Sequence, residues 1–153
     1  MRALPFAQLK SGFPVLNNPA NRKRTVSLTP SQFRYSFGNA ISEEESNELF
    51  EKWTIPGPGR PLFEETTANF SFHSPAAVDT HNAVRGPLLL VSGTEDHTVP
   101  RVVTRQVLKM YADNESSVTD YHEFEGRAHS LTIDSGWADV ANMSLDWLAT
   151  KGF

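Results

Sequence analysis

Two residues of this sequence, an aspartate and a histidine, stand where they could act together on a proton. Asp96 lies in a tight turn that follows the apolar run 88–91, and His129 lies in the glycine-containing loop 126–130. A carboxylate that accepts the Nδ1–H of an imidazole fixes the tautomer of the ring and stabilises its protonated form. The second ring nitrogen can then take a proton from a serine or a water, which is the chemistry of a hydrolase.

Each of these residues has a simpler interpretation when it is taken alone. An aspartate in a Gly-x-x-Asp turn commonly stabilises the turn itself, and a lone histidine is commonly a surface or core residue. Their joint placement favours chemistry, because both follow a predicted strand and the two strands are one βα unit apart. Loops at the carboxyl ends of parallel strands meet at one sheet edge, where sites form in open α/β sheets. The sequence therefore predicts that Asp96 and His129 lie close together.

The elements that position this pair read as strand, helix, strand and helix. Residues 88–91 form a continuous apolar run, typical of a strand buried on both faces of a parallel sheet, and a helix is predicted after Pro100. A second strand is predicted at residues 118–124, where charged side chains indicate a sheet edge. Asp134 or Ser135 can cap the last helix. This order predicts a right-handed βαβ unit with two parallel strands and flanking helices.

The first half of the chain has a different composition. It is rich in proline, asparagine and capping residues, and it has no apolar or alternating run of strand length. Thr29 with Gln32, and Ser42 with Glu45, have the spacing of capping boxes, so a helix is predicted after each pair. A third helix is suggested by residues 62–70. The chain therefore divides into a helical, cap-like region, residues 1–84, and a βαβα region, residues 85–153.

The βαβα region resembles part of a known family. Residues 87–100, residues 124–130 and the tryptophan-rich closing helix resemble the last third of the α/β-hydrolase fold, and residues 17–64 resemble the cap inserted before it. In that family the catalytic residues follow the chain order serine, acid, histidine. The resemblance implies a truncated α/β-hydrolase-like fold of the α/β class, in which Asp96 is the catalytic acid and His129 the base.

The serine nucleophile of that family has no counterpart in its usual place. A Gly-x-Ser-x-Gly elbow should precede the cap, and no such motif occurs in this chain. The serine could come from a separate N-terminal fragment, from a second copy of the chain, or from Ser92 or Ser130. The resemblance implies a hydrolase of small carboxylic esters or similar uncharged acyl compounds.

Two other functions remain open. The first is a non-catalytic assembly or ligand-binding module in which Phe33, Phe37, Phe50 and Trp53 form an apolar pocket wall. In a hydrolase the same wall would contact the substrate, and core packing also explains these aromatic residues. The second is a metal site, but its candidate ligands show no ligand-motif spacing, and neither a metal nor a cofactor is predicted. Those candidates are His73, Asp79, His81, Asp96 and His97.

Composition narrows the class of partner. The chain has 14 basic and 18 acidic residues, and its basic residues are scattered except at Arg22 to Arg24, so nucleic acid is not a predicted partner. No apolar run reaches the roughly 20 residues needed to span a bilayer, so no membrane association is predicted. The absence of cysteine and of an N-terminal signal pattern fits a cytoplasmic protein.

The strand at residues 88–91 is predicted to have one open edge. Unpaired backbone groups on such an edge attract another chain. The predicted partners are therefore a second copy of this chain, which would form a homodimer, or a complementing N-terminal fragment, together with a small-molecule substrate.

Overall fold

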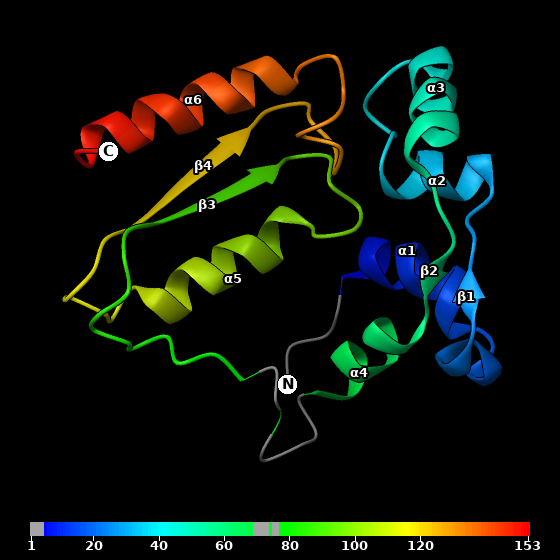
Figure 1. Cartoon of the computed structure of the whole chain (residues 1–153), viewed down its shortest axis with the longest axis horizontal. Coiled ribbons are helices and arrows are strands. Elements are labelled where there is room, and N and C mark those ends of the chain that lie inside the picture. Colours follow the sequence, from blue (N-terminus) through cyan, green and yellow to red (C-terminus); the bar gives the residue numbers. More distant parts are fainter. Residues whose placement is uncertain (1–4, 69–73, 75–76) are drawn as a thin grey trace.

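The computed structural model describes residues 5–68, 74 and 77–153, and within them it has six α-helices and two small sheets (Figure 1). The helical region contains α1 (Phe6–Leu16), the 3-10 helix η1 (Pro19–Lys23), β1 (Thr25–Val26), α2 (Pro30–Ser36), α3 (Glu43–Trp53), β2 (Gly57–Pro58) and α4 (Arg60–Ala68). The second region contains β3 (Leu88–Gly93), α5 (Arg101–Tyr111), β4 (Thr119–Phe124) and α6 (Trp137–Thr150).

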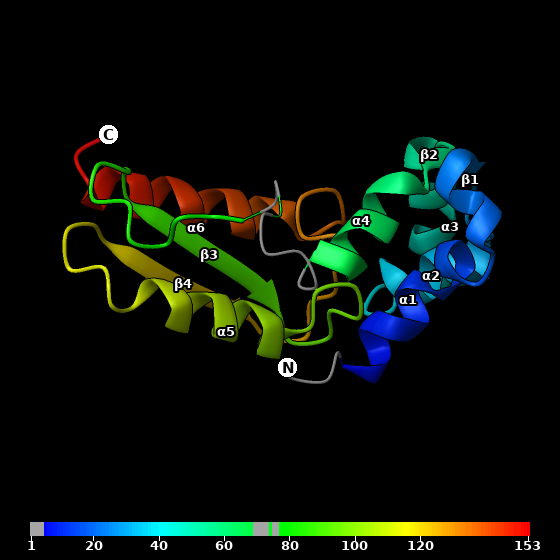
Figure 2. The ribbon, with the colours of Figure 1, turned by 90° about the horizontal axis from the view of Figure 1, so that it is seen from below.

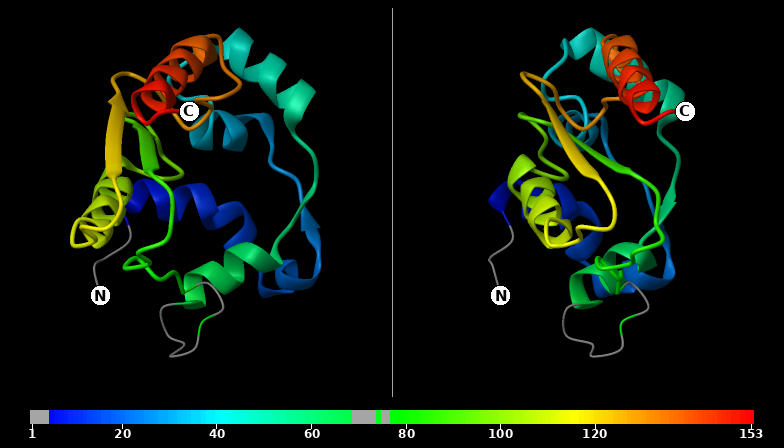
Figure 3. Two further views of the ribbon diagram at one scale, coloured as in Figure 1. Left: turned by 60° about the vertical axis from the view of Figure 1, so that its left-hand side comes forward. Right: turned by 90° about the vertical axis from the view of Figure 1, so that its left-hand side faces the viewer.

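The second region has the predicted parallel pair of strands. β3 and β4 run parallel, from Leu88 opposite Thr119 to Gly93 opposite Phe124. The two flanking helices, α5 and α6, lie on opposite sides of this pair (Figures 2 and 3). The prediction of an α/β class with two parallel strands is therefore confirmed. No described helix is long and apolar enough to cross a membrane.

The prediction that residues 88–91 are buried on both faces is wrong. All four are only half-buried, and burial is reached at Ser92 and Gly93, where β3 runs two residues beyond the predicted end. Within the described residues β3 has β4 as its one strand neighbour. On α6, the large apolar residues Trp137 and Leu145 remain 55% and 61% exposed. A sheet this narrow cannot enclose a central strand.

The start of α6 also differs from the prediction. Its N-cap is Gly136, with no side-chain cap, rather than Asp134 or Ser135. Asp134 is nevertheless used here: its carboxylate accepts the N–H of Gly136 at 3.0 Å and pairs with Arg127. The aspartate therefore stabilises the preceding turn and not the first turn of the helix.

The C-terminal part of α6 is held to β4 by one carboxylate. Asp120 accepts the indole N–H of Trp147 at 2.7 Å and lies 2.8 Å from the ammonium of Lys151. Hydrogen bonds from Lys151 and Trp147 lower the pKa of Asp120 below its usual value. The closing helix thus docks partly through polar contacts.

In the helical region, α2 and α3 begin directly after their predicted capping residues, Thr29 and Ser42. Thr29 and Gln32 form the complete capping box at α2, and Ser42 accepts the N–H of Glu45 at α3. The Glu45 carboxylate does not close a second box as predicted. It accepts the N–H of Ser135 at 2.6 Å and the hydroxyl of Ser135 at 3.1 Å, so it links the two regions.

Some elements of the helical region were not predicted. α1 has Pro14 inside it, and β1 pairs antiparallel with β2, Thr25 opposite Pro58. The third predicted helix is present as α4, although Phe70 of that prediction lies outside the described residues.

The helical region lies beyond the carboxyl ends of β3 and β4, the arrowheads in Figure 1. Four polar contacts join it to the turn after β3. Ser11 and Thr98 share a hydroxyl contact of 3.0 Å, Thr98 donates to the Ser36 carbonyl at 2.7 Å, His97 bonds the Tyr35 carbonyl at 2.8 Å, and Asn39 donates to the Glu95 carbonyl at 2.8 Å. The two regions therefore meet at the sheet edge that carries Asp96.

Candidate active site

The structure brings Asp96 and His129 into direct contact. The Nδ1 atom of His129 lies 2.8 Å from Oδ2 of Asp96. An ionised carboxylate can only accept, so this contact assigns the proton to Nδ1 and leaves Nε2 with its lone pair. Among residues 5–68, 74 and 77–153, no side chain or backbone group is bonded to Nε2. This arrangement leaves Nε2 able to accept a proton.

The turn after β3 holds the Asp96 carboxylate in place. Its Oδ1 atom accepts the backbone N–H groups of Thr98 and Val99, each at 2.8 Å, and the residue is 7% exposed. With the imidazole on Oδ2, the buried carboxylate has three hydrogen bonds. A carboxylate supported in this way keeps its orientation, and so does the ring that depends on it.

The two loops cross at a glycine. A Cβ atom at Gly93 would lie 2.2 Å from the carbonyl oxygen of Arg127 and 2.9 Å from that of Ala128. Two residues later, Glu95 donates its N–H to the Arg127 carbonyl at 2.9 Å. A side chain at position 93 would separate the loop of Asp96 from the loop of His129, so this close approach requires glycine.

An ion pair with a buried carboxylate supports the loop that carries His129. Arg127 pairs with Asp134 through Nη2 and donates from Nη1 to the carbonyl of Gly136 at 3.0 Å. The Asp134 side chain is 2% exposed and that of Arg127 is 17% exposed. The pair closes residues 127–136 around His129. Arg127 was part of the motif that suggested the site, but its partner could not be recognised from the sequence.

An apolar cavity of about 610 Å³ lies in the helical region, beside the Asp96–His129 pair. Of the four aromatic residues predicted as its wall, Phe33, Phe37 and Trp53 line it, and Phe50 does not; Phe50 packs against Phe33 with ring centres 5.8 Å apart. Phe37 also contacts the His129 ring, edge to face at 5.2 Å. Thr98 and Val99, whose N–H groups hold Asp96, line the same cavity. The cavity therefore adjoins the Asp96–His129 pair.

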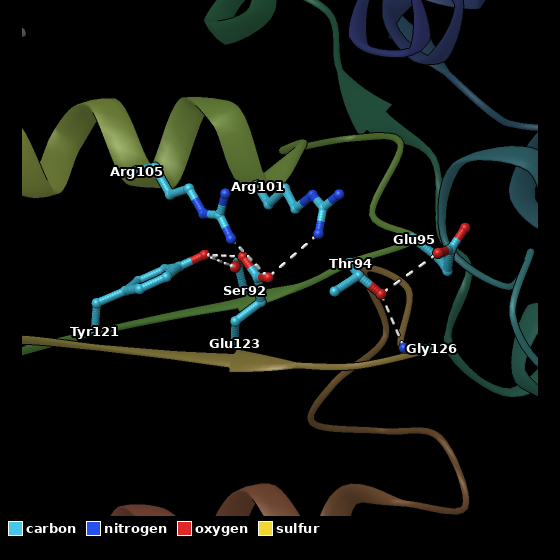
Figure 4. A network of polar contacts seen from close by, with 8 residues as sticks. All are labelled: Ser92, Thr94, Glu95, Arg101, Arg105, Tyr121, Glu123 and Gly126. Carbon is cyan, nitrogen blue, oxygen red and sulfur yellow. Dashed lines mark hydrogen bonds and ion pairs between the residues drawn. The ribbon is translucent and has the colours of Figure 1, made fainter.

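Ser92, one candidate nucleophile, is engaged elsewhere. It is 2% exposed, and its hydroxyl lies 2.6 Å from that of Tyr121, which donates to Glu123 at 2.5 Å (Figure 4). Because the Tyr121 proton goes to the carboxylate, Ser92 must donate to Tyr121. Glu123 also pairs with Arg101 and Arg105 of α5, and its pKa is lowered, first by the Tyr121 hydrogen bond and then by the arginines. Ser92 therefore belongs to this network and makes no hydrogen bond to His129.

Ser130, the other candidate, follows His129 directly. It is 4% exposed, and its hydroxyl has no hydrogen-bond partner in the described part of the chain. Its backbone carbonyl accepts the N–H groups of Ile133 and Asp134, each at 3.0 Å. Ser11 lies in the cavity wall. The Thr98 hydroxyl donates its proton to the Ser36 carbonyl, so in the contact between the two hydroxyls Ser11 must donate to Thr98. None of these serines is placed to give its proton to Nε2.

The residues considered as metal ligands do not gather. His97 bonds the Tyr35 carbonyl and stacks on the Tyr35 ring at 4.5 Å, while Asp79 accepts the N–H of His81 at 2.9 Å. No group of three or more histidine, cysteine, aspartate or glutamate side chains suited to a metal occurs in the described ranges. His73 lies outside them.

A comparison with protein-family models, with curated proteins and with solved structures found no match to this chain.

Proposed function

We propose that this chain is a hydrolase component of the α/β-hydrolase type, in which His129 is the general base and Asp96 orients it. The 2.8 Å contact between Asp96 Oδ2 and His129 Nδ1 carries the proposal, because it leaves Nε2 free to accept a proton. Phe37, which contacts the imidazole edge to face, also lines the apolar cavity, so this space adjoins the histidine.

The proposed reaction is the hydrolysis of an ester. Nε2 of His129 takes the proton of a serine hydroxyl or a water as its oxygen attacks the ester carbonyl, and the imidazolium is stabilised by Asp96, which stays ionised. The imidazolium then gives that proton to the alcohol oxygen as the bond from carbon to oxygen breaks. With a serine, water repeats both steps on the acyl-enzyme and releases the acid.

The cavity supports the proposed substrate class. Its volume of about 610 Å³ is within the range of small-molecule sites, and Phe33, Phe37 and Trp53 give it an aromatic wall. No lysine, arginine or histidine from the described part of the chain lines it, so an anionic acyl group would meet no compensating charge from these residues. A small uncharged carboxylic ester fits these properties.

Esterase assays with p-nitrophenyl acetate test the role of His129. We expect the purified chain to be a poor esterase, because its serines are not aligned with Nε2, yet to exceed the buffer rate through general-base catalysis on water. His129→Ala should lower the esterase rate above buffer by about a hundredfold. This factor is the lower end of the usual contribution of a general base. His81→Ala, which removes an exposed histidine, is the matched control and should keep it.

Two outcomes would contradict these expectations. An equal loss in both histidine variants, or none in His129→Ala, would remove His129 from the reaction. Turnover at ordinary enzyme rates that depends on His129 would instead reveal an aligned serine in the chain or in a dimer, and fluorophosphonate labelling would identify it.

We further propose that the open edge of β3 pairs with a second copy of the chain. Leu88 donates its N–H to the carbonyl of Val118, just before β4, and Thr94 donates to the carbonyl of Phe124, each at 3.0 Å. By alternation along a strand, the N–H groups of Leu89 and Val91 therefore point to the opposite edge. Unpaired strand edges favour such pairing. A two-fold axis would join identical edges antiparallel and give a continuous four-stranded sheet.

Light scattering at micromolar concentration tests this pairing. A dimer has twice the 17.0 kDa mass of the chain. Leu89→Pro removes a donor of the open edge without removing a β3–β4 hydrogen bond, and proline is tolerated at an edge strand, so a folded monomer is expected. Leu89→Val keeps the donor and should remain a dimer. If the unsubstituted protein is a monomer, pairing with a second copy of the chain is excluded.

A further inference from the structure

The basic run at residues 22–24 has no role in the proposed hydrolase site. Arg22, Lys23 and Arg24 are all exposed, and none of them forms an ion pair with a described residue. They directly precede β1, which lies on the side of the helical region away from β3 and β4 (Figures 1 and 2). Three cations on an open surface attract a partner that carries carboxylates.

Ser27 follows this run within an extended segment. Arg24 (φ −129°, ψ 166°) and Thr29 (φ −81°, ψ 162°) both have extended backbone, and β1 lies between them. Side chains alternate along such a segment. Val26 and Leu28 line the cavity, and Ser27 between them is exposed. The Ser27 hydroxyl therefore points away from the cavity and toward solvent.

The distance along the chain from the basic run to Ser27 suits one class of enzyme. A protein kinase that selects basic substrates binds an extended chain, and carboxylates of its groove pair with basic side chains before the acceptor, commonly with the third residue before it. Arg24 is the third residue before Ser27. Such a kinase needs an extended chain, free cations and an accessible hydroxyl, and residues 22–27 supply all three.

The structure selects Ser27 among residues with the same spacing. A basic residue is the third residue before four hydroxyl side chains, which are Thr25, Ser27, Thr104 and Ser130. Thr104 and Ser130 are only 8% and 4% exposed, so the folded chain does not present them to an enzyme. Thr25 lies inside β1, opposite Pro58 of β2, whereas Ser27 lies beyond this pair of strands. Ser27 is therefore the acceptor that a kinase can surround.

We propose that Ser27 is a phosphorylation site, modified by a protein kinase whose acidic substrate groove pairs with residues 22–24. The Ser27 oxygen forms a bond to the γ-phosphorus of ATP as the bond from that phosphorus to ADP breaks, and the hydroxyl proton passes to a carboxylate of the kinase. The phosphate carries a charge of about −1.5 to −2 at neutral pH. It lies on the outer side of the segment whose inner side chains, Val26 and Leu28, line the cavity. This proposal does not depend on the hydrolase function.

Incubation of the folded chain with ATP and the catalytic subunit of cyclic-AMP-dependent protein kinase, which selects this spacing, tests the site. We expect one phosphoryl group per chain, located on Ser27 by mass spectrometry of peptides and absent from Ser27→Ala. Arg24→Ala should lower kcat/KM for phosphorylation about tenfold, the value of one charge-assisted hydrogen bond. Lys109→Ala, which removes an exposed lysine of α5, is the matched control and should leave it unchanged.

Thr104 and Ser130 are internal controls for the role of the fold, because they have the same spacing but are buried. They should stay unmodified while Ser27 is phosphorylated, and circular dichroism should show that each variant is folded. Modification of the two buried residues as fast as Ser27 would mean that an unfolded chain is the substrate, which overturns the proposal. A folded chain that takes up no phosphate, takes it up on Thr25, or does not respond to Arg24→Ala overturns it as well.

Discussion

Replacement of Asp134 by alanine is expected to destabilise the protein by about 3 kcal/mol, the lower end of the cost of breaking a buried pair, because it removes the main partner of an Arg127 side chain that is only 17% exposed. The loss is large because the Asp134 side chain is 2% exposed and also accepts the N–H of Gly136. Urea unfolding followed by circular dichroism measures it. Since residues 127–136 surround His129, the variant should also lose the residual esterase rate.

Two control proteins separate burial from charge. Glu64→Ala breaks the exposed i,i+4 pair with Arg60 and should leave the stability nearly unchanged, because solvent screens this pair. Arg127→Met combined with Asp134→Leu removes both charges from the buried site and should be much closer to the parent than Asp134→Ala is. If Asp134→Ala were no more costly than Glu64→Ala, the ion pair would not support the loop.

Alanine at position 93 is expected to destabilise the fold by about 3 kcal/mol, at the upper end of the cost of overpacking. The obstacles are the backbone carbonyls of Arg127 and Ala128, at 2.2 and 2.9 Å from the added Cβ, and these cannot turn away as a side chain could. Relief requires the two loops to separate. We therefore expect the Asp96–His129 hydrogen bond to be lost as well.

The matched control for this substitution is Gly86→Ala. A Cβ there would meet nothing within 4 Å, and the residue is exposed. The change should lie within about 0.5 kcal/mol of the parent. Urea unfolding gives the stability of both variants, and the imidazole ¹⁵N shifts of His129 report the hydrogen bond to Asp96. A folded Gly93→Ala protein with unaltered shifts would contradict the proposed crossing.

Local patterns predicted the elements that are local in origin. The β3–α5–β4 unit follows from an apolar run, a helical apolar period and a second run, and the start of α2 follows from the reciprocal contacts of Thr29 and Gln32. α1 was not predicted, because Pro14 lies inside it and a proline usually ends a helix. The β1–β2 pair joins residues about thirty positions apart through two residues on each side, too few for any periodic signal.

Wrong predictions arose where a polar side chain had a distant partner. Glu45 was expected to close a capping box, and it binds Ser135; Asp134 was expected to cap α6, and it pairs with Arg127. Both residues have the right local spacing, but a tertiary contact takes the same oxygen atoms. The contact between Asp96 and His129 could be predicted because each follows a parallel strand. The cavity could not be predicted, since it depends on how α1, α3 and α4 pack.

Thr98 makes the geometry of the candidate base depend on the docking of the helical region. Its backbone N–H holds Asp96, while its hydroxyl donates to Ser36 and accepts from Ser11. Any displacement of α1 or α2 relative to the sheet must therefore pull on the residue that orients the carboxylate. The helical region is consequently a wall of the site, and a movement of that wall would reach His129 both through Thr98, which holds Asp96, and through Phe37, which contacts the imidazole.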